Sequence, residues 1–151
     1  RLKRVRHHLD DETFLMTYGD GVSDIDVGAL VDFHRSQDVQ ATLTAVRPPG
    51  RFGALVLDQG QTLVSNFTEK PRGDGEDAWI NGGFFVLEPS VLDHIDGDAT
   101  VWEREPLERL AEANALAAYQ HLGFWQPMDT LRDRMVLEDL WARDAAPWKR
   151  W

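Results

Sequence analysis

The sequence predicts an α/β protein with one mixed sheet and flanking helices. Residues 13–16 form a short apolar run typical of a buried strand, residues 26–37 have helical spacing, and residues 41–46 are rich in β-forming residues. A strand–helix–strand unit of this length predicts a parallel pair joined by a right-handed crossover. Residues 52–58 and 62–67 flank a Gln-Gly turn, so they predict an antiparallel hairpin. Strands of both orientations indicate a mixed sheet.

The second half of the chain continues the same alternation. An apolar run over residues 79–87, interrupted by a glycine pair, predicts a strand, and Pro89 opens a short helix. Pro106 lies at the first turn of another helix, where its missing N–H is tolerated. Residues 117–121 form a short strand, and the last helix begins at residues 129–130. We expect His34, on the apolar stripe of the helix over 26–37, to be packed rather than a ligand.

Length and charge limit the class of protein. The 151 residues correspond to one domain or to part of a larger one, and the net charge of −10 argues against a protein that grips nucleic acid through its phosphates. A small phosphorylated substrate remains compatible, because a divalent cation can bridge carboxylates and phosphates. The chain has no cysteine and no run of about 20 apolar residues, and we expect no signal peptide. We expect a soluble, cytoplasmic protein without a membrane partner.

The first residues are basic and lack an initiator methionine. Leu2, Val5 and Leu9 recur at helical spacing with arginine and lysine between them. The basic run is either a solvated helix face or a patch that faces phosphate. We expect sequence to be missing before Arg1.

Asp20 lies in the stretch around which the chain is organised. It follows the strand over residues 13–16, is flanked by Gly19 and Gly21, and precedes residues that start a helix. Open α/β sheets bind ligands at the carboxyl ends of their strands, which makes Asp20 a candidate site residue. Gly and Asp also dominate ordinary turns, so a plain turn is the alternative.

Two later stretches have polar groups suited to a sugar phosphate. Lys70, next to Glu69 in a loop directly after a strand, offers a compact charge for a phosphate, although most loop lysines are merely solvated. Asn81, Gly82 and Gly83 offer a side-chain amide and open backbone N–H groups, which suit sugar hydroxyls. The alternative for this second stretch is a β-bulge.

Asp129 has two interpretations as well. It precedes a helix, so N-capping explains it without any ligand. Alternatively, Asp20 and Asp129 hold one hard cation such as Mg²⁺, which takes one or two carboxylates plus substrate phosphates. Spacing in the sequence does not show that the two acids meet. No His/Cys cluster, nucleophile elbow, P-loop or dinucleotide fingerprint is present.

Taken together, these stretches resemble the glucose-1-phosphate cytidylyltransferase family of sugar nucleotidyltransferases. The resemblance covers nearly all of the chain in order, as the C-terminal two thirds of such a protein. The segments that carry it are Thr17-Tyr18-Gly19-Asp20-Gly21-Val22, Phe33-His34, Ala41-Thr42-Leu43-Thr44-Ala45, Pro48-Pro49-Gly50-Arg51-Phe52-Gly53-Ala54-Leu55, Glu69-Lys70-Pro71, Ile80-Asn81-Gly82-Gly83-Phe84-Phe85-Val86-Leu87 and Gly123-Phe124-Trp125-Gln126-Pro127-Met128-Asp129-Thr130.

The resemblance implies a fold and a reaction. The fold is a Rossmann-like mixed sheet with flanking helices, of the nucleotide-diphospho-sugar transferase type but lacking the N-terminal strands. Residues 1–151 are then the C-terminal part of a single domain, on its sugar- and metal-binding side. The reaction converts CTP and α-D-glucose 1-phosphate into CDP-glucose and pyrophosphate, for the 3,6-dideoxyhexoses of surface polysaccharide such as O-antigen. We expect Mg²⁺ as the cofactor and a homo-oligomer.

The resemblance also implies roles for seven residues. Metal ligation and catalysis fall on the two acids and a lysine, and substrate binding on the loop and strand residues near them. In this sequence Asp20 and Asp129 are the implied Mg²⁺ ligands, Lys70 contacts the sugar phosphate, Gly19 lies beside the substrate, and Glu69, Asn81 and Gly82 hold the glucose hydroxyls.

One departure from the family leaves three hypotheses open. The family's N-terminal glycine-rich loop, which cradles the nucleotide phosphates, does not occur in this sequence. The leading hypothesis is a fragment of the cytidylyltransferase, inactive by itself. The alternative is a non-catalytic module that binds a sugar phosphate or assembles with a separate nucleotide-binding chain. A purely structural remnant is third.

Overall fold

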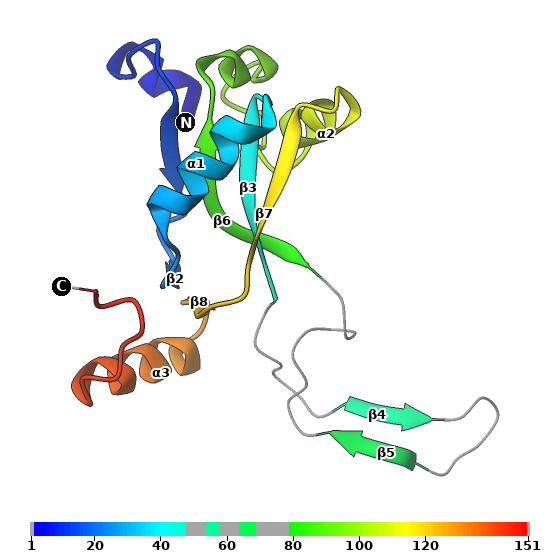
Figure 1. The fold of residues 1–151 in the computed structure, drawn as a ribbon, viewed down its shortest axis with the longest axis vertical. Coiled ribbons are helices and arrows are strands. Elements are labelled where there is room, and N and C mark those ends of the chain that lie inside the picture. Colours follow the sequence, from blue (N-terminus) through cyan, green and yellow to red (C-terminus); the bar gives the residue numbers. More distant parts are fainter. Residues whose placement is uncertain (1, 48–53, 58–63, 69–78, 151) are drawn as a thin grey trace.

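The computed structural model describes residues 2–47, 54–57, 64–68 and 79–150. These residues form helices and strands in alternation (Figure 1). In chain order the elements are η1 (Leu2–His8), β1 (Phe14–Thr17), β2 (Gly21–Ser23), α1 (Val27–Gln37), β3 (Ala41–Val46), β4 (Ala54–Leu57), β5 (Val64–Thr68), β6 (Ile80–Leu87), η2 (Pro89–His94), α2 (Glu105–Glu112), β7 (Leu116–His121), β8 (Trp125–Pro127) and α3 (Leu131–Ala142), where η marks a 3-10 helix.

The main sheet has four strands in the order β1-β6-β3-β7. Strand β6 is antiparallel to both β1 and β3, whereas β3 and β7 are parallel, so the predicted mixed sheet is confirmed. The predicted direct pairing of residues 13–16 with residues 41–46 is wrong. Both strands run in the same direction, but β6 lies between them and bonds to each. With eight residues, most of them buried, β6 fills the centre of the sheet and forms ladders on both sides.

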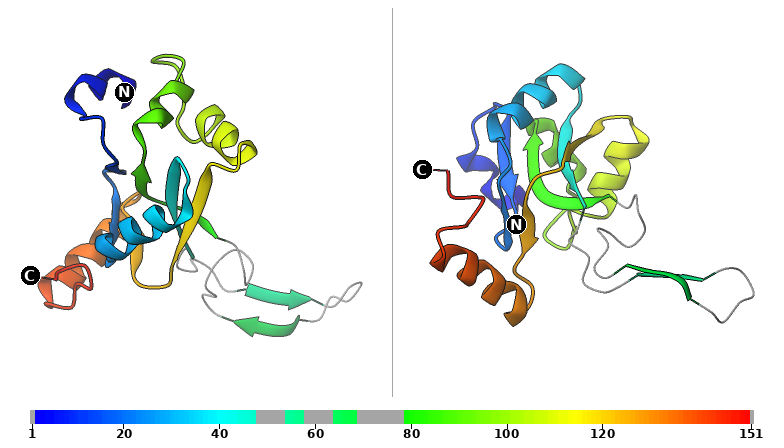
Figure 2. Two further views of the ribbon diagram at one scale, coloured as in Figure 1. Left: turned by 45° about the horizontal axis from the view of Figure 1, so that its top comes forward. Right: turned by 60° about the horizontal axis from the view of Figure 1, so that its bottom comes forward.

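Helices cover both faces of this sheet (Figure 2), and alternate residues of β6 pack into two separate cores. Phe85 and Leu87 pack in one core with Leu92 of η2 and Leu110 of α2. Val86 faces the other way, into a smaller core that contains Leu30 of α1. The period of two along the strand therefore gives each helical layer its own apolar surface.

Helix α1 has the bounds that the sequence predicts. Asp26 is its N-cap and accepts a 3.0 Å hydrogen bond from the backbone N–H of Ala29. His34 is buried on its inner face, with Nδ1 2.8 Å from Thr42 Oγ1 and Nε2 3.0 Å from Glu88 Oε1. The prediction that His34 is packed is confirmed.

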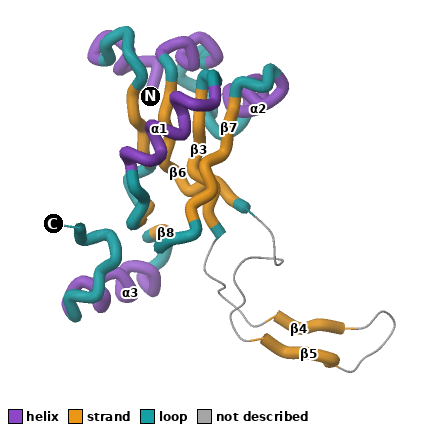
Figure 3. The backbone as a smooth tube through the Cα atoms, viewed as in Figure 1, coloured by secondary structure: helices purple, strands orange, loops and turns teal. Residues whose placement is uncertain are grey.

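Two smaller sheets complete the fold (Figure 3). Strands β2 and β8 form an antiparallel ladder beside α3. Strands β4 and β5 form the predicted antiparallel hairpin, and the turn between them lies outside the described residues. The hairpin extends away from the four-stranded sheet (Figure 1).

The basic start of the chain forms η1 and lies against η2. Arg6 Nη1 is 3.0 Å from Asp93 Oδ1, Arg4 pairs with Asp98, and Lys3 Nζ donates to the carbonyl of Ile95. The two arginines are paired with carboxylates of the same chain, which supports the solvated helix face over a phosphate patch.

Candidate functional site

The turn after β1 presents Asp20 at the surface. Gly19 and Asp20 form the turn, both are exposed, and the chain continues into β2 rather than directly into a helix. The plain-turn interpretation therefore describes the backbone correctly. It leaves the Asp20 carboxylate in solvent at the carboxyl end of β1, where open sheets bind ligands. At Gly19 an added Cβ would meet no described atom within 4 Å, so the surface beside Asp20 is open.

The β2–β8 ladder brings Asp129 to the same place. Gly21 pairs with Pro127 and Ser23 with Trp125, and the ladder closes where Met128 N–H donates to the Asp20 carbonyl at 2.8 Å. Asp129 is the next residue and is also exposed. The structure thus places two acids, distant in the sequence, at one end of a short ladder.

Capping does not account for Asp129, so that interpretation is wrong. The N-cap of α3 is Thr130, whose Oγ1 accepts from the N–H of Asp133 at 3.2 Å. Asp133 accepts in return from the N–H of Thr130 at 3.0 Å, which completes a capping box. Gln126 Nε2 also donates to Asp133 at 3.1 Å, inside the protein, and joins β8 to α3. The segment that carries Asp129 is therefore held at both ends.

The chemistry of this acid pair fits a hard divalent cation. Both groups are carboxylates, and Mg²⁺ typically takes one or two of these with substrate phosphates and water. Within the described ranges there is no group of three or more His, Cys, Asp or Glu residues that could hold a metal. Asp20 and Asp129 are compatible with a cation that the substrate helps to hold.

The second part of the site is an irregularity in β6. Leu43 pairs with Phe85, but Ala45 pairs with Asn81, so the three residues 82–84 of β6 stand opposite the single residue 44 of β3. The predicted bulge at residues 81–83 is confirmed. Gly83 has a φ of 79°, a left-handed conformation that favours glycine, and an added Cβ would lie 2.7 Å from the Tyr18 ring.

Asn81 holds this bulge with its own side chain. Its Oδ1 accepts from the Gly83 N–H at 2.9 Å, and its Nδ2 donates to the Tyr18 hydroxyl at 3.2 Å. One amide hydrogen and one carbonyl lone pair remain for a ligand. Burial of the phenol raises the pKa of Tyr18, and the hydrogen bond to Glu103 raises it further. Tyr18 therefore stays neutral and can orient Asn81.

An indole joins the two parts of the site. Trp125 of β8 donates from Nε1 to the Gly82 carbonyl of β6 at 2.8 Å. An added Cβ at Gly21 would lie 3.7 Å from that carbonyl oxygen, so β2 runs directly past the bulge. The β2–β8 ladder, which leads to the two acids, therefore packs against the Asn81–Gly82 segment.

A hydrogen-bonded cluster around one histidine also supports the β2–β8 ladder. His121, at the end of β7, places Nε2 2.9 Å from Asp24 Oδ1 and 3.2 Å from Ser23 Oγ. Ser23 donates in turn to the carbonyl of Phe124 at 2.8 Å. The cluster ties β7 to β2 and so fixes the ladder that joins the two acids.

The sequence-predicted site residues fall into two groups. Gly19, Asp20 and Asp129 are exposed beside the β2–β8 ladder, Asn81 is half-buried in the adjacent bulge, and Gly82 is buried there. Glu69 and Lys70 lie outside the described residues, directly after β5. Tyr18 and Trp125 were not assigned roles from the sequence, although both lie inside the segments that carry the family resemblance.

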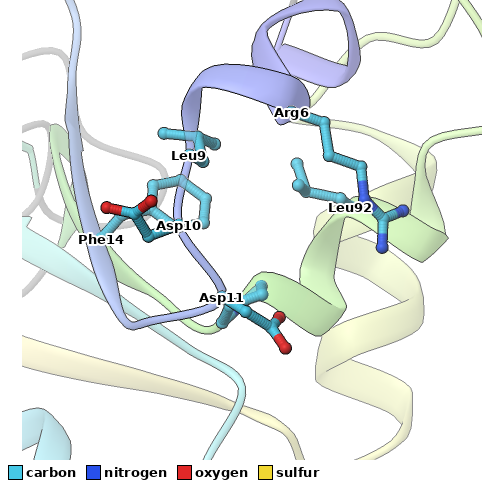
Figure 4. A pocket seen from close by; sticks show the side chains of 7 residues that line it. Arg6, Leu9, Asp10, Asp11, Phe14 and Leu92 are labelled. Atoms are coloured by element: carbon cyan, nitrogen blue, oxygen red, sulfur yellow. The ribbon is translucent and has the colours of Figure 1, made fainter.

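A separate hollow lies at the other end of β1 (Figure 4). Its volume is about 220 Å³. Its lining has a mixture of charged and apolar side chains, namely Arg6, Leu9, Asp10, Asp11, Phe14, Pro89 and Leu92. None of the candidate site residues that the structure describes lines this hollow.

Comparison with known protein families assigns this chain to one of them. The sequence model of the nucleotidyl transferase family matches residues 2–127. The chain belongs to the nucleotidyl transferase family. The match includes β1, the Asp20 turn, the β6 bulge and β8.

Two relatives in the nucleotidyl transferase family are similar to this chain along its whole length. Glucose-1-phosphate cytidylyltransferases from Salmonella typhi and Salmonella typhimurium are each 61% identical to this chain over 152 residues. The alignments cover 100% of this chain and 58% of each relative, so the chain spans little more than half of their length.

Solved structures support the fold. A structure from Bacillus anthracis in complex with sucrose matches with a TM-score of 0.63 at 14% identity, covering 99% of this chain and 60% of its own. HddC from Yersinia pseudotuberculosis matches with a TM-score of 0.61 at 17% identity, covering 89% of this chain and 58% of its own. At such identities the likeness concerns the fold, and it agrees with the predicted nucleotide-sugar transferase type. None of the described helices is long and apolar enough to cross a membrane.

Proposed function

We propose that the full-length protein containing this chain transfers a cytidylyl group from CTP to α-D-glucose 1-phosphate. The products are CDP-glucose and pyrophosphate, and CDP-glucose feeds the synthesis of 3,6-dideoxyhexoses for surface polysaccharide. The observation that carries the proposal is the convergence of Asp20 and Asp129 at the end of the β2–β8 ladder, next to the β6 bulge. The 61% identity to cytidylyltransferases supports the choice of nucleotide and sugar.

The reaction needs positioning and charge neutralisation more than a protein nucleophile. A phosphate oxygen of glucose 1-phosphate attacks the α-phosphorus of CTP, and the bond from that phosphorus to the β-phosphate oxygen breaks as pyrophosphate leaves. Asp20 and Asp129 would hold Mg²⁺, which when bound neutralises charge on the phosphates. Asp20 and Asp129 are both exposed residues.

The sugar would lie along the bulge of β6. Asn81 offers its remaining amide hydrogen to a glucose hydroxyl, and Tyr18 orients that amide. Glu69 would bind a further hydroxyl and Lys70 the sugar phosphate, from the segment that follows β5. Gly19 leaves the approach beside Asp20 open.

A pyrophosphate-release assay on the full-length protein tests this function. We expect release with CTP, glucose 1-phosphate and Mg²⁺ together, and none when any one is left out. CTP is expected to be preferred over UTP, GTP and ATP, because two relatives at 61% identity are glucose-1-phosphate cytidylyltransferases. Equal use of all four nucleotides would contradict the base assignment.

The metal assignment has a sharper test. An Asp20→Asn, Asp129→Asn double variant should lose at least about 100-fold in turnover, because it removes both carboxylates from the phosphate site. Asp139→Asn, on the exposed face of α3 and paired with Arg143, is the matched control and should keep wild-type turnover. Normal turnover in the double variant would contradict the role of the two acids.

The span of the chain favours one alternative, a module that binds a sugar phosphate or assembles with a separate nucleotide-binding chain. Calorimetry of the 151-residue chain with glucose 1-phosphate and with CDP-glucose separates the two. Turnover by the 151-residue chain alone would contradict the proposal that it is inactive without the rest of the protein. Absence of binding by the chain, alone and with candidate partners, would argue against the binding module.

A further inference from the structure

The hydrogen bond between Trp125 and Gly82 connects the two halves of the candidate site. Trp125 belongs to β8, the strand that leads to Asp129, whereas Gly82 belongs to the bulge beside Asn81. The indole Nε1 lies 2.8 Å from the Gly82 carbonyl oxygen, a short distance for a bond between neutral groups. The acid pair and the sugar-side bulge are thus linked by a side chain that neither half requires for its own strand pairing.

Gly82 lies where the regular pairing of β6 with β3 is interrupted. Asn81 pairs with Ala45 and the ladder resumes at Phe85 with Leu43, so Gly82 lies outside the paired residues. Gly82 has no side chain of its own to pack, and an added Cβ would lie 2.7 Å from Val46 Cγ1. Its carbonyl direction is set instead by the indole of Trp125.

Trp125 is itself held in place. It pairs with Ser23 in the ladder, and Ser23 is bonded to the carbonyl of Phe124, the residue before Trp125. The indole is half-buried against the bulge rather than free in solvent. The indole of β8 therefore adds a restraint on the bulge of β6, beside the one that the Asn81 side chain supplies.

We propose that Trp125 is a positioning residue for the sugar side of the site. It sets the distance between the Asn81–Gly82 segment, which would bind the glucose, and the Asp20–Asp129 end of the ladder, where the phosphates would lie. The proposal rests on the proposed function and deepens it. Trp125 does not touch the reacting atoms; it acts through Gly82.

The test is Trp125→Phe in the full-length protein. Phenylalanine keeps an aromatic ring but removes the N–H, so the Gly82 carbonyl loses its donor. We expect the dissociation constant for CDP-glucose, measured by calorimetry, and the KM for glucose 1-phosphate to rise about five- to tenfold, the effect of one lost hydrogen bond. The KM for CTP should not change.

Trp102→Phe is the matched control. Trp102 also packs its indole inside the protein, against Phe85, but its Nε1 has no hydrogen-bond partner among the described residues. The control makes the same ring contraction without loss of a hydrogen bond. It should lower the melting temperature while leaving the CDP-glucose dissociation constant at the wild-type value.

A measurement on the unmodified protein covers the case in which Trp125→Phe does not fold. In ¹H–¹⁵N spectra, the indole N–H resonance of Trp125 should shift on addition of CDP-glucose and stay in place on addition of CTP alone. An unmoved resonance with CDP-glucose overturns the proposal. So does a folded Trp125→Phe variant with wild-type sugar parameters, or one that weakens CTP and CDP-glucose equally.

The two proposals fail in different ways. A wild-type protein that releases no pyrophosphate from CTP and glucose 1-phosphate overturns the proposed function. A wild-type protein that does so, together with a Trp125→Phe variant whose sugar parameters are unchanged, overturns the role of Trp125 and leaves the function in place.

Discussion

Gly83 is the residue whose backbone most directly shapes the bulge of β6. Its φ of 79° is costly for any residue with a side chain, and a Cβ would collide with Tyr18. Gly83→Ala should therefore lower the free energy of unfolding by about 1–3 kcal/mol, measured by urea denaturation. Gly97→Ala is the control, because a Cβ there meets no described atom within 4 Å. Equal loss in both variants would show that the bulge does not require glycine.

Single residues were predictable where their role is local. The exposed turn at Asp20, the packed His34 and the bulge at residues 81–83 follow from neighbours in the sequence, and the structure has all three. Tyr18 and Trp125 are different, because their partners Asn81 and Gly82 are remote along the chain. An aromatic residue in a strand pattern does not reveal what its polar atom will bond.

Among the helices and strands, the start of α3 connects stability to the acid pair. Thr130→Ala removes the capping side chain and should cost about 1 kcal/mol of unfolding free energy. Because Asp129 is the preceding residue, the Mg²⁺ concentration for half-maximal pyrophosphate release should also rise. Asp26→Ala is the control: it removes the N-cap of α1, far from Asp129 in the chain.

The two cap variants should lose similar stability but differ in their magnesium dependence. A Thr130→Ala variant with the wild-type magnesium dependence would show that the position of Asp129 does not depend on the cap.

The elements themselves were largely predictable, and their arrangement was not. The helix predicted over residues 26–37 is α1 at Val27–Gln37, and the strand predicted over 79–87 is β6 at Ile80–Leu87. These segments carry clear periodicity and strong end signals. The insertion of β6 between β1 and β3 has no local signature, because it depends on which strands compete best for the centre of the sheet. The cap of α3 was misassigned by one residue, since Asp129 and Thr130 are both good N-cap types.

For the molecule as a whole, the pKa shifts predict loss of stability in acid. Burial by itself would raise the pKa of Glu88, but the hydrogen bonds from Thr13 and His34 outweigh burial, so the pKa lies below its ordinary value. A lowered pKa in the folded state means that the carboxylate stabilises the fold above the unfolded-state pKa. That contribution is lost as the pH falls through the folded-state pKa.

Glu88→Gln tests this sign. The variant should be less stable than the wild type at pH 7, by urea denaturation, and the difference should shrink as the pH falls below the ordinary range of a glutamate. Glu108→Gln, on the exposed face of α2, is the control. A difference between Glu88→Gln and the wild type that grows towards low pH would contradict the assignment. Three exposed carboxylates with pKa values lowered by basic partners, Asp96, Asp98 and Asp144, act in the same direction.

The pairing of β2 with β8 has a consequence for how the molecule forms. The ladder joins residues 21–23 to residues 125–127, and the parallel pair β3–β7 joins residues 41–46 to residues 116–121. Contacts between such distant segments close large loops, which slows folding. On the ribosome, Asp20 emerges early but has no counterpart until the segment around Asp129 has been made. The two acids are therefore brought together only once the Asp129 segment has been made, and a nascent chain interrupted before β8 carries Asp20 without Asp129.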